Sequence, residues 1–142
     1  MVKFLKNILE IFGVVYLRFR IVPRLWCVWL VAVNAASLLF IGHIEAQVVL
    51  AATGIAVVIQ ALIYNKTGFT RILGSAHILW VPMFAWMATR LETIQADPML
   101  ALWLTVLFVT NAVSLIIDAI DAARYFRGER TPHYSWAETQ TA

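Results

Sequence analysis

The sequence predicts an all-α integral membrane protein: an antiparallel four-transmembrane-helix bundle preceded by an N-terminal interfacial amphipathic helix. The 142-residue chain is 62% hydrophobic, with a mean hydropathy of +0.81, whereas soluble domains are roughly 45–50% apolar. It contains four apolar runs of 18 or 19 residues without a charged side chain. Its basic residues gather at every second connection between these runs, as in multi-pass membrane proteins.

Residues 1–24 carry the pattern of a helix that lies in the membrane interface. Apolar residues such as Ile8, Phe12 and Val15 recur three or four positions apart, which places them on one helical face. A broad apolar face opposite a basic one favours an interfacial position. Pro23 is expected to break this helix and turn the chain into the membrane. The predicted polar face consists of Lys3, Lys6, Asn7, Glu10 and Arg18.

The four apolar runs predict four spanning helices, because about 20 helical residues cross the hydrocarbon core. Their short connections force neighbouring helices to run antiparallel. The chain therefore divides into the interfacial helix, one transmembrane domain over 25–127, and a short cytoplasmic tail over 128–142. The predicted spans are 25–43, 46–64, 72–89 and 99–120.

The distribution of lysine and arginine predicts the orientation. Five lie in the N-terminal segment, two in the loop after the second run and three in the tail, so ten of eleven lie on one side. Only Arg90 lies in the two remaining loops. Because basic loops stay in the cytoplasm, both termini are predicted to be cytoplasmic, in a cell inner (plasma) membrane.

Polar residues within the apolar runs are the candidate site. On the last run, Asn111 and Ser114 share one helical face with two aspartates. Counting about 1.5 Å per residue from the inner boundary places Gln60 roughly 6 Å deep, His77 roughly 8 Å and Asn34 roughly 14 Å. Polar groups in hydrocarbon usually face the bundle interior. The predicted polar intramembrane cluster is His77, Asn111, Ser114, Asp118, Gln60 and Asn34.

Asp118 and Asp121 are predicted to lie where the last helix reaches water. Arg124 follows Asp121 by three residues, so an ion pair between them is expected at the interface. His77 leaves two interpretations open. It is either a packed histidine with a hydrogen-bond partner or a titrating group or ligand, since imidazole titrates near neutral pH.

No sequence motif assigns a catalytic, metal or cofactor site, and the single cysteine, Cys27, has no partner for a disulfide. The first hypothesis is therefore a non-catalytic membrane protein acting as an accessory or assembly subunit or a homo-oligomeric building block. A second is a small oligomeric transporter or channel with a proton or cation path through the polar cluster. A third is a membrane enzyme or cofactor carrier that uses His77, Asp118 and Asp121. The expected partners are the lipid bilayer and a further copy or membrane protein. Nucleic acid is not expected, because the basic residues lie at membrane boundaries.

Overall fold

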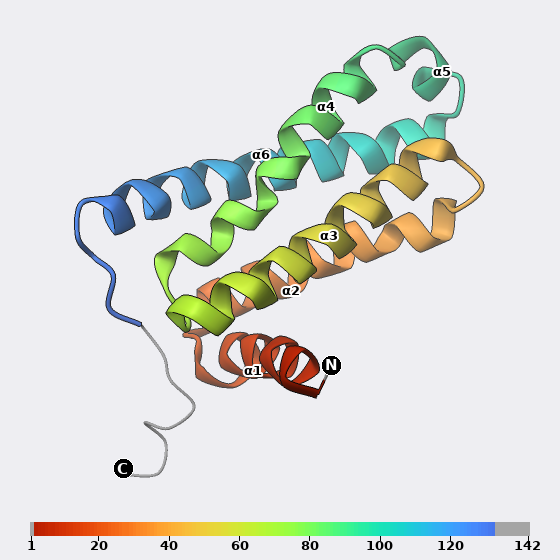
Figure 1. The fold of residues 1–142 in the computed structure, drawn as a ribbon. Helices are drawn as coiled ribbons and strands as arrows, with labels where there is room; N and C mark the ends of the chain where they lie inside the picture. Colours follow the sequence, from red (N-terminus) through yellow and green to blue (C-terminus); the bar gives the residue numbers. More distant parts are fainter. Residues whose placement is uncertain (1, 133–142) are drawn as a thin grey trace.

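The computed structural model describes residues 2–132, and all of the secondary-structure elements in that range are helices (Figure 1). The prediction of an all-α chain is confirmed for these residues. Most of the predicted tail, residues 133–142, lies outside the described residues. The elements in order are α1 (Val2–Arg18), α2 (Ile21–Ala35), η1 (Ala36–Phe40), α3 (Ile44–Thr67), η2 (Arg71–Leu79), α4 (Trp80–Ala88), α5 (Leu91–Gln95) and α6 (Pro98–Phe126).

Three helices are long and apolar enough to cross a membrane. They are Ile21–Phe40, in which η1 continues α2, then α3 and α6. Large apolar side chains are exposed along them, including Leu39, Leu62 and Ile116, and such surfaces require lipid or protein cover. The three helices correspond to the first, second and fourth apolar runs.

The third apolar run differs from a single α-helix. It begins as η2, a 3-10 helix of nine residues, and only then becomes α-helical in α4. Pro82 is the third residue of α4. Proline lacks the N–H that an α-helix needs beyond its first turn, so α-helical hydrogen bonding does not continue backwards through Pro82. Figure 1 shows the two segments running one after the other alongside α6.

The break between α1 and α2 also differs from the expected one. It falls at Phe19 and Arg20, whereas Pro23 is accommodated in the first turn of α2, where a missing N–H costs nothing. The Arg24 guanidinium donates to the carbonyl of Phe19 at 2.8 Å and to that of Leu17 at 3.4 Å. A basic side chain thus satisfies carbonyls left open at the end of α1.

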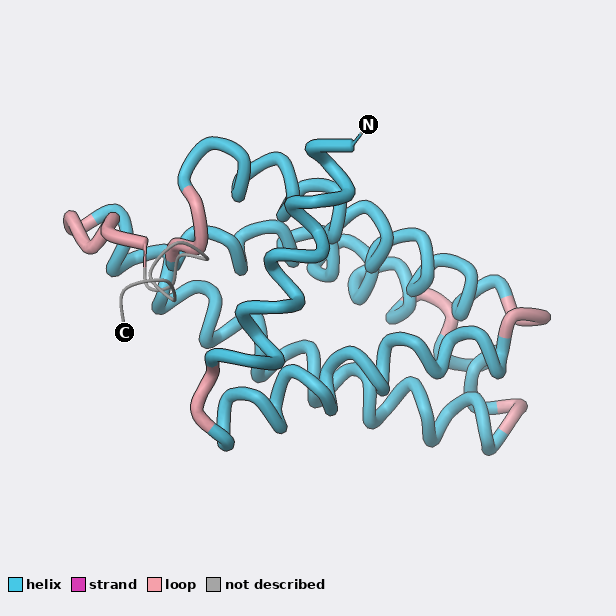
Figure 2. Tube along the Cα trace, turned by 90° about the horizontal axis from the view of Figure 1, so that it is seen from below, coloured by secondary structure: helices cyan, strands magenta, loops and turns pink. Residues whose placement is uncertain are grey.

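Helix α1 crosses the long helices at a steep angle (Figures 1 and 2) and packs against α3. The Asn7 amide donates to the carbonyl of Ala61 at 3.3 Å, and the Tyr64 hydroxyl donates to Glu10 at 3.0 Å. Asn7 and Glu10 therefore face α3 and do not belong to a solvated polar face. Leu5 and other apolar side chains on α1 remain exposed.

The main hydrophobic core lies toward the α5 end of the molecule. It joins residues of α2, α3, α4 and α6 around Trp80 and Leu107. The Trp103 indole donates to the carbonyl of Val33 at 3.0 Å. Asp97 caps α6 by accepting from the two amides that follow Pro98, and Pro98 occupies the first helical position, where its missing N–H costs nothing. The opposite end, where α1 lies, is less tightly filled.

Candidate functional site

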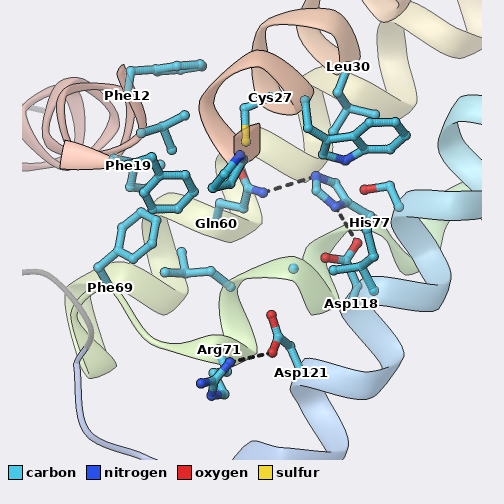
Figure 3. Close-up of a pocket in the computed structure, with 18 of the residues that line it drawn as sticks. Phe12, Phe19, Cys27, Leu30, Gln60, Phe69, Arg71, His77, Asp118 and Asp121 are labelled. Carbon is cyan, nitrogen blue, oxygen red and sulfur yellow. Dashed lines mark hydrogen bonds and ion pairs between the residues drawn. The ribbon is translucent and has the colours of Figure 1, made fainter. Parts of the chain in front are cut away.

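A cavity of about 850 Å³ opens at the α1 end, between α1, α2, η2 and α6. This volume falls within the range of small-molecule sites. Figure 3 shows Phe12, Phe19 and Phe69 on one side of the cavity and His77 and Asp118 on the other. The aromatic side chains that line it are Phe12, Tyr16, Phe19, Trp26 and Phe69.

The polar side of the cavity is centred on His77. Its Nδ1 lies 2.8 Å from Asp118 Oδ2, and its Nε2 lies 3.1 Å from Gln60 Nε2 (Figure 3). The Gln60 amide nitrogen can only donate, so Nε2 accepts and Nδ1 carries the ring hydrogen that is donated to Asp118. The imidazole stacks on Trp80 with ring centroids 4.2 Å apart.

A second pair closes the cavity nearer the end of α6. Arg71 Nη1 lies 2.6 Å from Asp121 Oδ1, and Arg71 Nε lies 3.0 Å from Glu129 Oε2 without hydrogen-bond geometry. Arg124 pairs with Glu129 at 2.8 Å. The expected pairing of Asp121 with Arg124 is therefore wrong, because Arg71 reaches Asp121 from η2 while Arg124 turns to the chain beyond α6.

The 3-10 geometry of η2 explains why these groups face α6 together. Arg71, Gly74 and His77 are three residues apart, and a 3-10 helix has three residues per turn, so they form one column. All three line the cavity opposite Asp118 and Asp121. Three consecutive turns of η2 thus place a guanidinium group, a glycine without a side chain and an imidazole opposite the two carboxylates of α6.

Gly74 is the one residue of that column that has no side chain. A Cβ at this position would overlap the Asp118 carboxylate. A glycine is needed here because the Asp118 carboxylate occupies the space that a Cβ at position 74 would take.

Asn34 and Asn111 form a separate cluster deeper in the bundle. Each amide nitrogen donates to the other side chain's oxygen, at 2.9 and 3.1 Å, and the Thr53 hydroxyl donates to Asn34 Oδ1 at 3.3 Å. Asn34 also donates to the carbonyl of Leu30. Both asparagines are buried, and their hydrogen bonds link α2, α3 and α6. The structure thus divides the predicted polar residues into two groups.

Ser114 lies on the cavity wall, one turn before Asp118. It is 4% exposed, and its hydroxyl has no hydrogen-bond partner among residues 2–132. Asp118 Oδ1 also accepts no hydrogen bond within that range, and the Asp118 side chain is 17% exposed. Asp118 is therefore part of the buried site and does not sit at a freely solvated boundary.

Sequence reasoning missed Arg71, Gly74 and the aromatic side of the cavity. The spacing of three between Arg71, Gly74 and His77 is visible in the sequence, but nine residues are too few to separate a period of 3.0 from 3.6. The contribution of Phe12 and Phe19 depends on how α1 folds back. No charge or motif signals that fold.

Within the described part of the chain, no three His, Cys, Asp or Glu side chains are grouped as a metal site would need. No protein-family model, curated protein or solved structure matches this chain.

Proposed function

We propose that this chain is a non-catalytic multi-pass protein of the cell inner membrane that holds an amphiphilic molecule in the cytoplasmic half of its bundle. It crosses the membrane four times, with α1 in the interface and both termini in the cytoplasm. In this proposal it acts as an accessory or assembly subunit, or as a homo-oligomer. The cavity beside α1 is the observation that carries the binding role.

The length of the third segment supports four crossings. A 3-10 helix rises about 2.0 Å per residue, so the nine residues of η2 extend about 18 Å. The nine residues of α4 add about 14 Å at an α-helical rise. Together they reach roughly 30 Å, the thickness of the hydrocarbon core. Figure 1 shows this segment crossing α6 and extending from the α1 end of the molecule to α5.

The placement of charge supports the proposed orientation. Arg71 lies at the same end of the molecule as α1 and the end of α6, and Arg90 lies at the opposite end, beside α5. The basic residues of α1 and of the segment after α6 lie with Arg71, so the cavity end carries most of the positive charge, as a cytoplasmic face does. The exposed apolar side chains of α1 would lie against lipid there.

Cysteine labelling tests the topology. In a Cys27→Ser background, Glu92→Cys is expected to react with an impermeant maleimide on intact cells. Lys66→Cys and Glu129→Cys should react only after permeabilisation. Labelling of Lys66→Cys on intact cells would reverse the orientation, and protection of Glu92→Cys would contradict the third crossing.

The chemistry of the cavity wall supports an amphiphilic ligand. Aromatic rings supply apolar contact on one side. On the other side, the Ser114 hydroxyl and Asp118 Oδ1 have no hydrogen-bond partner in the described range 2–132. Sites for small molecules combine a mainly apolar wall with a few polar groups in this way.

Binding of 1-naphthylmethanol to the protein in lipid nanodiscs tests this role by calorimetry. We expect saturable binding that is lost in Leu30→Trp, because Leu30 lines the cavity. Val15→Trp narrows the cavity from α1 and gives an independent second variant. Ile116→Trp is the control, because it adds the same bulk on the exposed face of α6. Equal binding by the cavity variants and the control would refute the binding role.

A second function, a proton or cation path in an oligomer, is favoured by the contact of His77 with Asp118. An imidazole and a carboxylate in contact within a membrane can pass a proton between them, as in the proton relays of pumps and transporters. Proton flux into proteoliposomes should then require His77 and disappear in His77→Ala. Flux that is unchanged in this variant, or absent from the wild type, counts against a path.

A further inference from the structure

We infer that the cavity selects a protonated amine carried on an apolar or aromatic body, with Asp118 as its counter-charge. This inference rests on the proposed binding role and adds the charge and hydrogen-bonding character of the ligand. It depends on three features of the cavity: its charge balance, its unused hydrogen-bonding atoms and its aromatic side.

Among residues 2–132, the charge balance leaves Asp118 without a permanent cation in direct contact. The charged residues that line the cavity are Arg20, Arg71, Asp118 and Asp121. Arg71 and Asp121 neutralise each other at 2.6 Å, and Arg20 is exposed in the connection between α1 and α2. Asp118 contacts the His77 imidazole, which is a cation only when it is protonated. A charge held in a low-dielectric site is costly unless it is paired, so a cation beside Asp118 is favoured over a neutral or anionic group.

The cavity oxygens that have no partner among residues 2–132 suit a ligand that donates hydrogen bonds. Ser114 Oγ and Asp118 Oδ1 have no partner among residues 2–132, and Ser114 precedes Asp118 by one helical turn on the same face of α6. An ammonium group offers up to three N–H donors and no acceptor. It can therefore donate to either oxygen, and its bond to the carboxylate is charge-assisted. A carboxylate ligand would place two anions together.

The aromatic side suits the rest of such a molecule. Phe12, Phe19 and Phe69 lie across the cavity from Asp118 (Figure 3), and Tyr16 and Trp26 also line the cavity. Aromatic faces attract cations and also bury apolar surface. A ligand with a cationic head and a ring or short chain can use both sides of the cavity.

Three probes that share one ring system test the inference: 1-naphthylmethylamine, 1-naphthylmethanol and 1-naphthylacetate. At about pH 7 the amine is protonated and the acetate ionised. Binding to the protein in nanodiscs is measured by calorimetry, with empty nanodiscs as the blank. We expect the amine to bind about tenfold or more tightly than the alcohol, and the acetate to bind most weakly.

Variants assign the selectivity to the named atoms. Asp118→Asn should reduce amine affinity to the level of the alcohol, while alcohol binding is kept and reports a folded cavity. Ser114→Ala should weaken the amine severalfold and the alcohol less. Glu92→Gln, an exposed acidic residue outside the cavity, is the charge-matched control and should change nothing.

The outcomes separate this inference from the binding role. Equal binding of amine and alcohol by the wild type, or tightest binding of the acetate, overturns amine selectivity and leaves the cavity as an amphiphile site. If none of the three probes binds, both amine selectivity and the proposed binding role are overturned. If Asp118→Asn also loses the alcohol, the wild-type preference and Ser114→Ala still decide. A wild-type preference that survives in Asp118→Asn overturns the role of Asp118.

Discussion

Gly74 on η2 lies against the carboxylate of Asp118 on α6, so closely that no side chain fits between the two segments. Gly74→Ala should push α6 away and break the contact of Asp118 with His77. We expect a loss of about 1–3 kcal/mol in the free energy of unfolding, as in other overpacked cores, measured by denaturation in mixed micelles. Gly54→Ala is the control, because a Cβ there meets no atom within 4 Å. It should leave stability unchanged or raise it by about 0.4–1 kcal/mol.

The amide pair of Asn34 and Asn111 should behave as one unit. Asn111→Leu leaves the buried Asn34 amide without its partner, and we expect a loss of about 1–2 kcal/mol. In the double variant with Asn34→Leu no asparagine amide is left unpaired there, so the two losses should not add. A double-mutant cycle in the same denaturation assay measures this coupling. Additive losses would show that the pair contributes nothing as a pair.

Glu45 and Arg90 form a pair at the α5 end, 2.7 Å apart, and Glu45 is 2% exposed. Arg90→Ala removes the counter-charge and should cost about 1–3 kcal/mol, because the carboxylate stays buried with only the backbone N–H of Glu45 as a donor. Adding Glu45→Gln should recover part of this loss, since it removes the charge. If Arg90→Ala leaves the denaturation midpoint unchanged, the pair is not a stabilising contact.

Glu129 should titrate below its ordinary value. Its hydrogen bond with the Arg124 guanidinium holds the pKa of this carboxyl below the usual 4.5, and the charge of Arg71 lowers it further. A pKa lowered by folding means that the stabilising contribution is present above the unfolded pKa and is lost as the pH falls through the folded value. The carboxyl carbon shift of Glu129, followed by NMR against pH, measures this pKa.

Arg124→Gln should then raise the pKa of Glu129 toward 4.5. Arg127→Gln is the control, because it removes a nearby basic residue that forms no ion pair with Glu129 in the described chain. Equal shifts in both variants would mean that general charge, and not the contact with Arg124, sets the pKa.

The sequence predicted the features that depend on composition along one segment. Charge-free apolar runs mark three long helices, and Pro98 marks the start of α6. Counting residues from the membrane boundary places Gln60 and His77 at similar depths, and the two side chains are in contact. These properties follow from one helix at a time.

The contacts that the sequence did not predict depend on how each helix is rotated about its axis relative to its neighbours. The position of Asp118 along α6 predicts that it lies at the water boundary. Its contact with His77, however, depends on which residues of η2 face it. Asn111 and Asp118 share a face of α6, yet they pair with different elements. Rotation about a helix axis changes neither composition nor depth. Single-sequence patterns therefore do not report it.

The helix type of η2 determines whether the polar wall exists. If its nine residues changed from 3-10 to α geometry, the segment would shorten by about 4–5 Å. Positions three apart would also turn by about 60° relative to one another, so Arg71 and His77 would point in directions that differ by about 120°. One helix face of α6 could no longer engage both. The contacts of Arg71 with Asp121 and of His77 with Asp118 therefore both depend on the extended 3-10 backbone of η2, and a change in its helix type would break the two contacts together.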